Sequence, residues 1–314
     1  MRFLSTGICA LASVLALASC AASQHSAAFV PQEARELVTQ HPLAHWTKTS
    51  IGTFGDPYGV AVDQYCSGQC NVFVSDPGNR AVYLVRPDGS RTAIADTAKF
   101  GSDFDPQGIS YLEYGKRILI ADKGYNGASS FVAIVSLHGY HARLRDSFAE
   151  FPKYNRAVAG YSYYNSVKDQ AAAVYAAQAT YHPLVSQGAV ACVEGPSCLF
   201  GSRPFSDPYG VAVGGKGTLF VVDARDKKAY RITHHEFHEL GMTFADPYGI
   251  AVTADEKEVY VADAGAKKIY WRGANGVWSE IGAFADPYAV AVQADRTVYV
   301  ADPGSRQVWR LTPP

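Results

Sequence analysis

One phrase of four residues, Asp-Pro-Tyr-Gly, recurs along this chain of 314 residues and constrains its fold more than any other feature. Each copy follows closely after a phenylalanine and leads into a short apolar run such as 60–62. Five copies, of which the second reads Asp-Pro-Gln-Gly and the last Asp-Pro-Tyr-Ala, begin at Asp56, Asp105, Asp207, Asp246 and Asp286. Such a repeat predicts an array of similar supersecondary units, and residues shared by every unit are expected to be structural.

The spacing of the copies predicts the type of unit. The last three aspartates lie 39 and 40 residues apart, and a period of about 40 residues is typical of a four-stranded propeller blade. Short runs rich in Val, Ile and Tyr, bounded by Gly, Pro and Asp, supply the strands. We expect first strands at 59–62 and 210–213, second strands at 219–223, 259–263 and 298–302, third strands at 229–232, 269–272 and 308–311, and fourth strands at 236–240 and 277–281.

The repeats predict an all-β, six-bladed β-propeller. Asp105 and Asp207 lie 102 residues apart, which leaves room for one degenerate blade between 149 and 206, with its second strand at 173–177. Five blades with a long insertion are the alternative. The last blade ends after its third strand, so residues 45–54 are expected to pair beside 308–311 and close the ring, which removes exposed strand edges. The Asp-Pro-x-Gly phrase itself is expected to form a β-turn.

The repeat resembles the NHL family of propellers. The resemblance rests on Asp-Pro-x-Gly, a following strand that ends in Asp, and a basic turn such as Asn79-Arg80 or Lys267-Lys268; it covers 45–137 and 205–311 well and 138–204 poorly. The resemblance implies a fold rather than one activity. The peptide-amidating lyase has a similar architecture and holds zinc with histidines around its channel, but the inner-strand motifs here carry no histidine. Streptogramin lyases and sugar lactonases are also propellers, but their acid–base residues cannot be placed on this chain.

The N-terminal segment predicts export to a bacterial envelope. Residues 1–19 combine a basic start, a short apolar stretch and small residues, as a secretory signal peptide does. Leu-Ala-Ser-Cys resembles a lipobox, which implies a lipid on Cys20, a tether over 20–44 and a propeller over 45–314. An ordinary signal peptide cut nearby is the alternative. The expected location is lipid-anchored at the periplasmic face or in the outer membrane, with the anchor as the only membrane contact.

The remaining cysteines form two local pairs. In an oxidising compartment we expect disulfides between Cys66 and Cys70 and between Cys192 and Cys198. A zinc site is the alternative, but these spacings fit the usual zinc patterns poorly. The net charge of −1 and the lack of a basic stripe argue against a nucleic-acid partner. No metal and no cofactor are expected, and the chain is expected to be a monomer.

The candidate ligand site consists of residues at equivalent positions beside the inner strands. They are Tyr58, Gln107, Tyr209, Tyr248 and Tyr288. Tyrosine offers rigid apolar area with a polar tip, so these residues are candidates for a collar around one mouth of the channel; packing between blades is the alternative. The repeated aspartates are expected to cap turns rather than to hold a cation.

No catalytic motif stands out in the sequence. We therefore predict a binding or scaffold protein for a protein, peptide or glycan of the envelope. The alternative is a propeller enzyme, a lyase or hydrolase with its active site at the channel mouth. The tyrosine-rich region 138–204 departs from the repeat, and it is interpreted either as an eroded blade or as the place where a specific ligand binds.

Overall fold

The computed structural model describes residues 46–112, 116–124, 131–137, 142–143, 155–162, 171–178, 188–194, 204–233 and 236–314. The expected signal peptide, Cys20 and the tether lie outside these residues. Within the described residues, no helix is long and apolar enough to cross a membrane. Strands dominate, and a single turn of α-helix, α2 (Thr97–Phe100), follows the first sheet.

The described strands form six four-stranded antiparallel sheets. Five of them are β2–β5 (Gly59–Val62, Val72–Asp76, Ala81–Val85, Arg91–Asp96), β6–β9 (Pro106–Leu112, Arg117–Asp122, Phe131–Ser136, Ala142–Arg143), β10–β13 (Asn155–Ser162, Ala171–Gln178, Gly188–Glu194, Pro204–Phe205), β14–β17 (Pro208–Val213, Leu219–Asp223, Lys228–Thr233, Glu236–Glu239) and β18–β21 (Pro247–Val252, Val259–Asp263, Lys268–Arg272, Trp278–Ile281). The remaining sheet contains β22 (Ala289–Val292), β23 (Val298–Asp302), β24 (Gln307–Thr312) and β1 (Thr47–Thr53).

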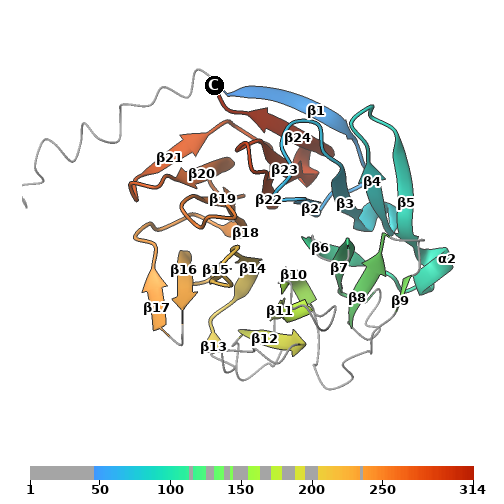
Figure 1. Ribbon diagram of the computed structural model, residues 1–314, viewed down its shortest axis with the longest axis horizontal. Helices are drawn as coiled ribbons and strands as arrows, with labels where there is room; N and C mark the ends of the chain where they lie inside the picture. Colours follow the sequence, from blue (N-terminus) through green and yellow to red (C-terminus); the bar gives the residue numbers. More distant parts are fainter. Residues whose placement is uncertain are drawn as a thin grey trace, which may run out of the picture. The chain divides into compact units, whose positions relative to one another are not determined.

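The sheets are arranged around a central axis, and the fold is a β-propeller (Figure 1). Each inner strand packs against the inner strands of the two neighbouring sheets, in the cyclic order β2, β6, β10, β14, β18, β22 and back to β2. Sheet β10–β13 lies where the degenerate unit was predicted, and 173–177 fall within β11. This sheet is described chiefly by its backbone, whereas the other five also have described side chains.

The ring closes through the first described strand. β1 pairs antiparallel with β24, with Thr47 opposite Thr312 and Thr53 opposite Gln307. Figure 1 shows the two ends of the described propeller side by side, with β1 in blue and β24 in red. The prediction that 45–54 would pair beside 308–311 is confirmed, because the last sheet has only three strands of its own.

Apolar clusters between neighbouring sheets form the core. One cluster joins β2–β5 to β6–β9 and includes Phe73, Phe104 and Ile118, which are 2% exposed or less. The phenylalanine before each Asp-Pro copy is buried in every case. These rings fill the space between adjacent sheets, so the repeated phenylalanine is a packing residue, as expected of a residue shared by all units.

The glycine of the repeat is required by close approach between inner strands. A Cβ on Gly210 would lie 2.4 Å from the carbonyl oxygen of Tyr248, and one on Gly249 would lie 2.6 Å from that of Tyr288. Real Cβ atoms do not approach backbone oxygens so closely. At Gly210 and Gly249 the absence of a side chain therefore allows this close approach of neighbouring inner strands, whereas the last copy accommodates Ala289 at the equivalent position.

The Asp-Pro-Tyr-Gly phrase is not a β-turn, contrary to the prediction. Pro208 and Pro247 already belong to inner strands β14 and β18, where a bulge follows each. The carbonyl of Asp207 accepts from the N–H of Ala224 at 2.9 Å instead of from the residue three positions on. The phrase is a bend that leads the chain into the inner strand, because its hydrogen bonds go to the loop after the second strand.

One of the two predicted disulfides lies within the described side chains. Cys66 and Cys70 are joined by a disulfide, with their Cα atoms 6.2 Å apart, so this prediction is confirmed. Cys192 belongs to β12, whose side chains are not described, and Cys198 lies outside the described residues.

Candidate functional site

The repeat brings four tyrosines together at one mouth of the channel. Ring centroids lie 4.5 Å apart for Tyr58 and Tyr288, 4.2 Å for Tyr209 and Tyr248, and 4.5 Å for Tyr248 and Tyr288. Tyr209 also meets Tyr288 edge-on at 6.1 Å. Each tyrosine directly follows the proline of its Asp-Pro copy, so the repeat itself carries these four rings to the axis.

Gln107 holds the equivalent position in β6 but does not join the tyrosines. Its side chain is 7% exposed, and its Nε2 donates to Oδ1 of Asp105 at 3.0 Å. The structure therefore brings together four of the five predicted ligand-binding residues and turns the fifth toward its own bend. The interruption that the sequence showed at this position leaves the collar asymmetric.

Carboxylates of the repeated bends lie beside the tyrosine rings. The hydroxyl of Tyr248 donates to Oδ2 of Asp246 at 2.6 Å. Burial, followed by the charges of neighbouring carboxylates, raises the pKa of Asp56 and the pKa of Asp286 above the usual range. The negative charges of Asp246 and Asp56, which belong to other blades, contribute to the raised pKa of Asp286. The positive charges of Arg306 and Lys267 oppose this shift at Asp56 and Asp286, respectively. We call these three aspartates and the four tyrosines the tyrosine mouth.

Burial also raises the pKa of the Tyr58 and Tyr248 hydroxyls. For Tyr58 the further causes are the neighbouring rings of Tyr209 and Tyr288, and for Tyr248 they are its hydrogen bond to Asp246 and the ring of Tyr288. These hydroxyls are therefore protonated at neutral pH. The Tyr248 hydroxyl donates its proton to a hydrogen bond with the Asp246 carboxylate.

The second set of repeated aspartates, at the ends of the second strands, is structural. Asp263 accepts from the N–H groups of Ala245 and Asp246 at 2.7 and 2.8 Å, and from that of Ala266 at 3.0 Å. Asp76, Asp223 and Asp302 accept from the two backbone N–H groups at the bends of their own blades in the same way. The expectation that these residues cap the bends is confirmed. Among the described residues, no three His, Cys, Asp or Glu side chains are grouped as a metal site would require.

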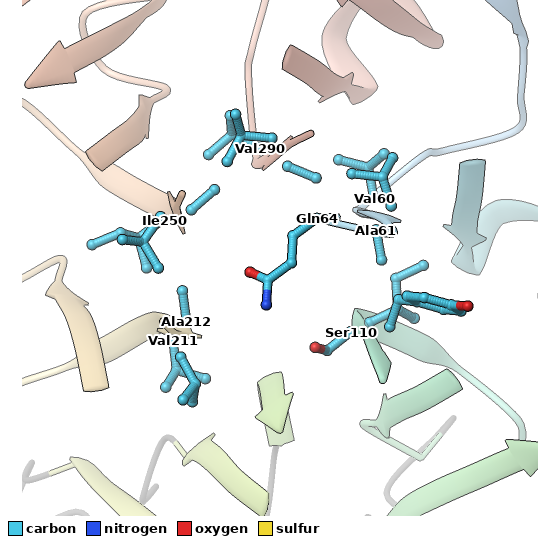
Figure 2. A pocket seen from close by; sticks show the side chains of 16 residues that line it. Val60, Ala61, Gln64, Ser110, Val211, Ala212, Ile250 and Val290 are labelled. Atoms are coloured by element: carbon cyan, nitrogen blue, oxygen red, sulfur yellow. The ribbon is translucent and has the colours of Figure 1, made fainter. Parts of the chain in front are cut away.

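Residues of the inner strands line the interior of the channel. Valine, isoleucine and alanine side chains of the inner strands surround a space of ≈ 100 Å³. Figure 2 shows Gln64 extending into this space between Val60, Val211 and Ile250, and Ser110 also lines the space. In this part of the channel, Gln64 and Ser110 are the polar side chains described beside the valines and alanines, apart from the ring of Tyr111.

A loop crosses the other end of the channel. Residues 63–70, which we call the plug loop, follow β2 and contain the disulfide. The carbonyl of Cys66 accepts from the N–H of Ala294 at 3.2 Å, and the N–H of Gly68 donates to Oδ2 of Asp295 at 2.7 Å. Both bonds attach the loop to the sheet of β22, so the plug loop spans from one blade to another while Gln64 enters the channel.

Sequence reasoning missed the plug loop, although a signal was present. Residues 63–71 connect β2 to β3, whereas 214–218, 253–258 and 293–297 make the same connection in other blades. The longer connection marks an insertion at this end of the first blade. Its position across the channel could not be read from the sequence, because it depends on contacts with residues more than 220 positions away.

The tyrosine mouth encloses little space. The space beside the four tyrosines is ≈ 60 Å³, which is less than an organic substrate requires. Within the described residues, the tyrosine mouth and the channel wall contain no histidine, lysine or cysteine side chain. What the mouth offers is a surface of π-faces with carboxylates around it.

Comparison with solved structures agrees with the fold. Virginiamycin B lyase from Staphylococcus aureus superimposes with a TM-score of 0.57 at 14% identity, over 85% of this chain and 98% of that chain. A gluconolactonase from Xanthomonas campestris gives 0.61 at 13% identity, over 85% and 89%. A protein of unknown function from Bacteroides thetaiotaomicron gives 0.59 at 13% identity, over 85% and 76%.

No protein-family model matches the chain, and no curated protein does either. The NHL resemblance therefore stays an expectation. At such low identities the solved structures show the fold alone. What they establish is that this chain is a β-propeller like those of the lyase and the lactonase.

Proposed function

We propose that this chain is a binding protein whose tyrosine mouth receives a basic side chain of a peptide or protein partner. The observation that carries the proposal is the contact of four tyrosine rings at one mouth together with carboxylates of the same bends. Cations bind over aromatic faces with about 0.5–2 kcal/mol per contact, more when water is excluded. Lysine and arginine side chains combine this charge with a stem that packs on apolar rings.

The charges at the mouth support the same ligand class. The raised pKa values of Asp56 and Asp286 have burial as their first cause and neighbouring carboxylates as their second. A cation placed among these carboxylates relieves their mutual repulsion. A neutral glycan would not, so of the three partner classes predicted from the sequence, a basic peptide or protein fits best.

Peptide titration tests this function. Calorimetry with a lysine-containing peptide and its norleucine analogue is expected to show binding of the lysine form, weakened about tenfold by Tyr288→Leu, which keeps apolar volume but removes a π-face. Tyr270→Leu on β20, which packs against Phe244 and lies outside the mouth, is the matched control. Equal affinity for the two peptides would sink the proposal.

A second candidate function is catalysis, and the comparisons favour it over a scaffold role. Two of the solved structures reported above are named as enzymes, a virginiamycin B lyase and a gluconolactonase. By this analogy the chain would open a cyclic ester or lactone at the channel mouth. Incubation with a streptogramin B or a sugar lactone, with and without added divalent cations, tests it; turnover that is lost in Tyr288→Leu but retained in Tyr270→Leu would replace the binding proposal.

We also propose a location and a blade number. A lipid on Cys20 would hold the propeller at the bacterial envelope, and Cys20→Ser is expected to release the chain from membranes into the soluble fraction.

The cyclic packing of inner strands supports sheet β10–β13 as a sixth blade of NHL type. A Cys192–Cys198 disulfide would join two parts of that blade, and mapping of disulfide-linked peptides tests the pairing.

A further inference from the structure

A cavity of ≈ 400 Å³ lies beside the plug loop, outside the channel. It is larger than the channel spaces of ≈ 100 and ≈ 60 Å³. Small-molecule pockets usually enclose about 300–1,000 Å³ and are mostly apolar with a few polar groups. The cavity is bounded by side chains of the sheets β2–β5 and β6–β9 and by the disulfide.

Two stacked aromatic rings form part of the apolar wall of this cavity. Phe73 on β3 and Tyr111 on β6 stack with centroids 5.5 Å apart and an interplanar angle of 11°. Leu84 and Leu137 complete the apolar wall. Phe73 and Leu84 are 2% and 7% exposed, so both are held firmly by the core. A planar apolar group is the shape that such a wall accommodates.

The polar wall has an excess of positive charge. Arg86 and Lys116 line the cavity, and Asp63 is the acidic residue there among the described lining residues. Oδ1 of Asp63 already accepts from the N–H of Tyr65 at 2.9 Å. Within the described part of the chain, neither Arg86 nor Lys116 forms an ion pair, although Nη1 of Arg86 donates to Thr92 at 2.9 Å. Among the described lining residues, two cations and one carboxylate therefore face the cavity.

The disulfide preorganises the cavity. Cys66 and Cys70 both line it, and Cys70 is 6% exposed. The loop that carries them is attached to another blade through Gly68 and Asp295. A wall fixed in this way loses little conformational freedom when a ligand enters, which favours affinity.

We propose that this cavity is a binding site for a small organic anion with a planar apolar body. The body would pack on Phe73 and Tyr111, and the anionic group would bind Arg86 and Lys116 through charge-assisted hydrogen bonds. The site is separate from the tyrosine mouth, so it does not depend on the function proposed there. This cavity would select an anion, whereas the tyrosine mouth is proposed to bind a cation.

Two fluorescent probes that differ by one charge test the proposal. The anion 8-anilinonaphthalene-1-sulfonate is expected to bind the folded chain with a stoichiometry of about one, and more tightly than neutral N-phenyl-1-naphthylamine. In Arg86→Gln/Lys116→Gln the affinity for the anion is expected to fall about tenfold, with the neutral probe unchanged. The control is Lys216→Gln/Lys257→Gln, which removes the same charge from two residues outside the described cavity lining and is expected to leave both affinities unchanged.

A second variant locates the bound probe. Leu84→Trp is expected to fill the cavity and abolish binding of both probes, and circular dichroism and thermal unfolding check that the variant folds. If Leu84→Trp unfolds, competition by a non-fluorescent aryl carboxylate that is lost in Arg86→Gln/Lys116→Gln serves instead. Equal affinity for the two probes, or the same loss in the control pair as in the Arg86/Lys116 pair, would overturn the proposal.

Discussion

The two ends of the propeller channel are built by different means. At the tyrosine mouth, four of the five copies of the repeat each contribute one tyrosine, and the four rings pack on one another. At the other end, a single non-repeated loop from the first blade crosses to the sheet of β22. A repeat brings the same residue type to one place, whereas an insertion in one unit breaks the symmetry and contributes to a pocket beside that blade.

This contrast predicts unequal tolerance to an added methyl group. Gly210→Ala at the mouth would place a Cβ 2.4 Å from the carbonyl oxygen of Tyr248, and we expect a loss of about 3 kcal/mol in unfolding free energy from the backbone shift. Gly68→Ala in the plug loop meets nothing within 4 Å, although its φ is +78°; its expected cost is about 1 kcal/mol. Chemical denaturation of both variants measures the difference, and equal losses would contradict the contrast.

Substitution of one hydrogen-bonding aspartate at each end of the channel is expected to cause a smaller difference in stability. Asp263 accepts three backbone N–H groups that shape the bend before Tyr248. Asp263→Ala is expected to cost about 2 kcal/mol, since buried donors lose their acceptor, and to weaken binding at the mouth. Asp295→Ala removes acceptors for Gly68 and Thr297 and is expected to cost about 1 kcal/mol. Thermal unfolding measures the stability loss in each variant, and peptide titration measures binding at the tyrosine mouth. A loss of binding at the mouth in Asp295→Ala would show that the two ends of the channel are coupled.

Removing the disulfide tests whether the plug end is locally constrained. Cys66→Ser/Cys70→Ser opens a loop of sequence separation 4, and the chain-entropy estimate for so short a loop is at most about 2 kcal/mol. We expect the loss to be near 1 kcal/mol and hydrogen exchange to increase in 63–70 but not at the tyrosine mouth. Increased exchange throughout the sheets would instead make the disulfide a support of the whole ring.

The smallest effect is a pH dependence at the mouth. Asp56 and Asp286 have raised pKa values, so as pH falls they gain protons at a higher pH than an unperturbed aspartate does. The folded state then binds protons more tightly than the unfolded state, and their contribution to stability rises as pH falls through this window and decreases as pH rises. Binding of a basic peptide follows the opposite direction, because it needs the charged carboxylates.

A few-fold weaker affinity for the lysine peptide is therefore expected at acidic pH than at neutral pH, together with a small gain in stability from these two groups. Asp56→Asn/Asp286→Asn should flatten both trends. Calorimetric titration and denaturation across the pH range provide the measurements. A variant that retains the full pH dependence of binding would assign it to other groups.

Much of the fold was predictable because each unit repeats the same local rules. The second strands 219–223, 259–263 and 298–302 begin and end where the sequence placed them, since runs of buried valine, tyrosine and alanine end at an aspartate that hydrogen-bonds a bend. Closure by 45–54 followed from counting strands. The reading of Asp-Pro-Tyr-Gly as a turn was wrong, because the hydrogen bonds that shape it come from another strand of the same blade.

For the candidate sites too, the repeated features were predictable from the sequence and the contacts between blades were not. The sequence alone determined that tyrosines would stand at equivalent positions beside the inner strands, because residues with the same place in a repeat have the same place in each unit. Only the tertiary structure decided that Gln107 turns aside to Asp105, that Gln64 enters the channel and that Arg86 and Lys116 face one cavity. These outcomes depend on contacts between blades. Such contacts are set by the geometry of a closed ring, and they produce no recurring pattern in the sequence.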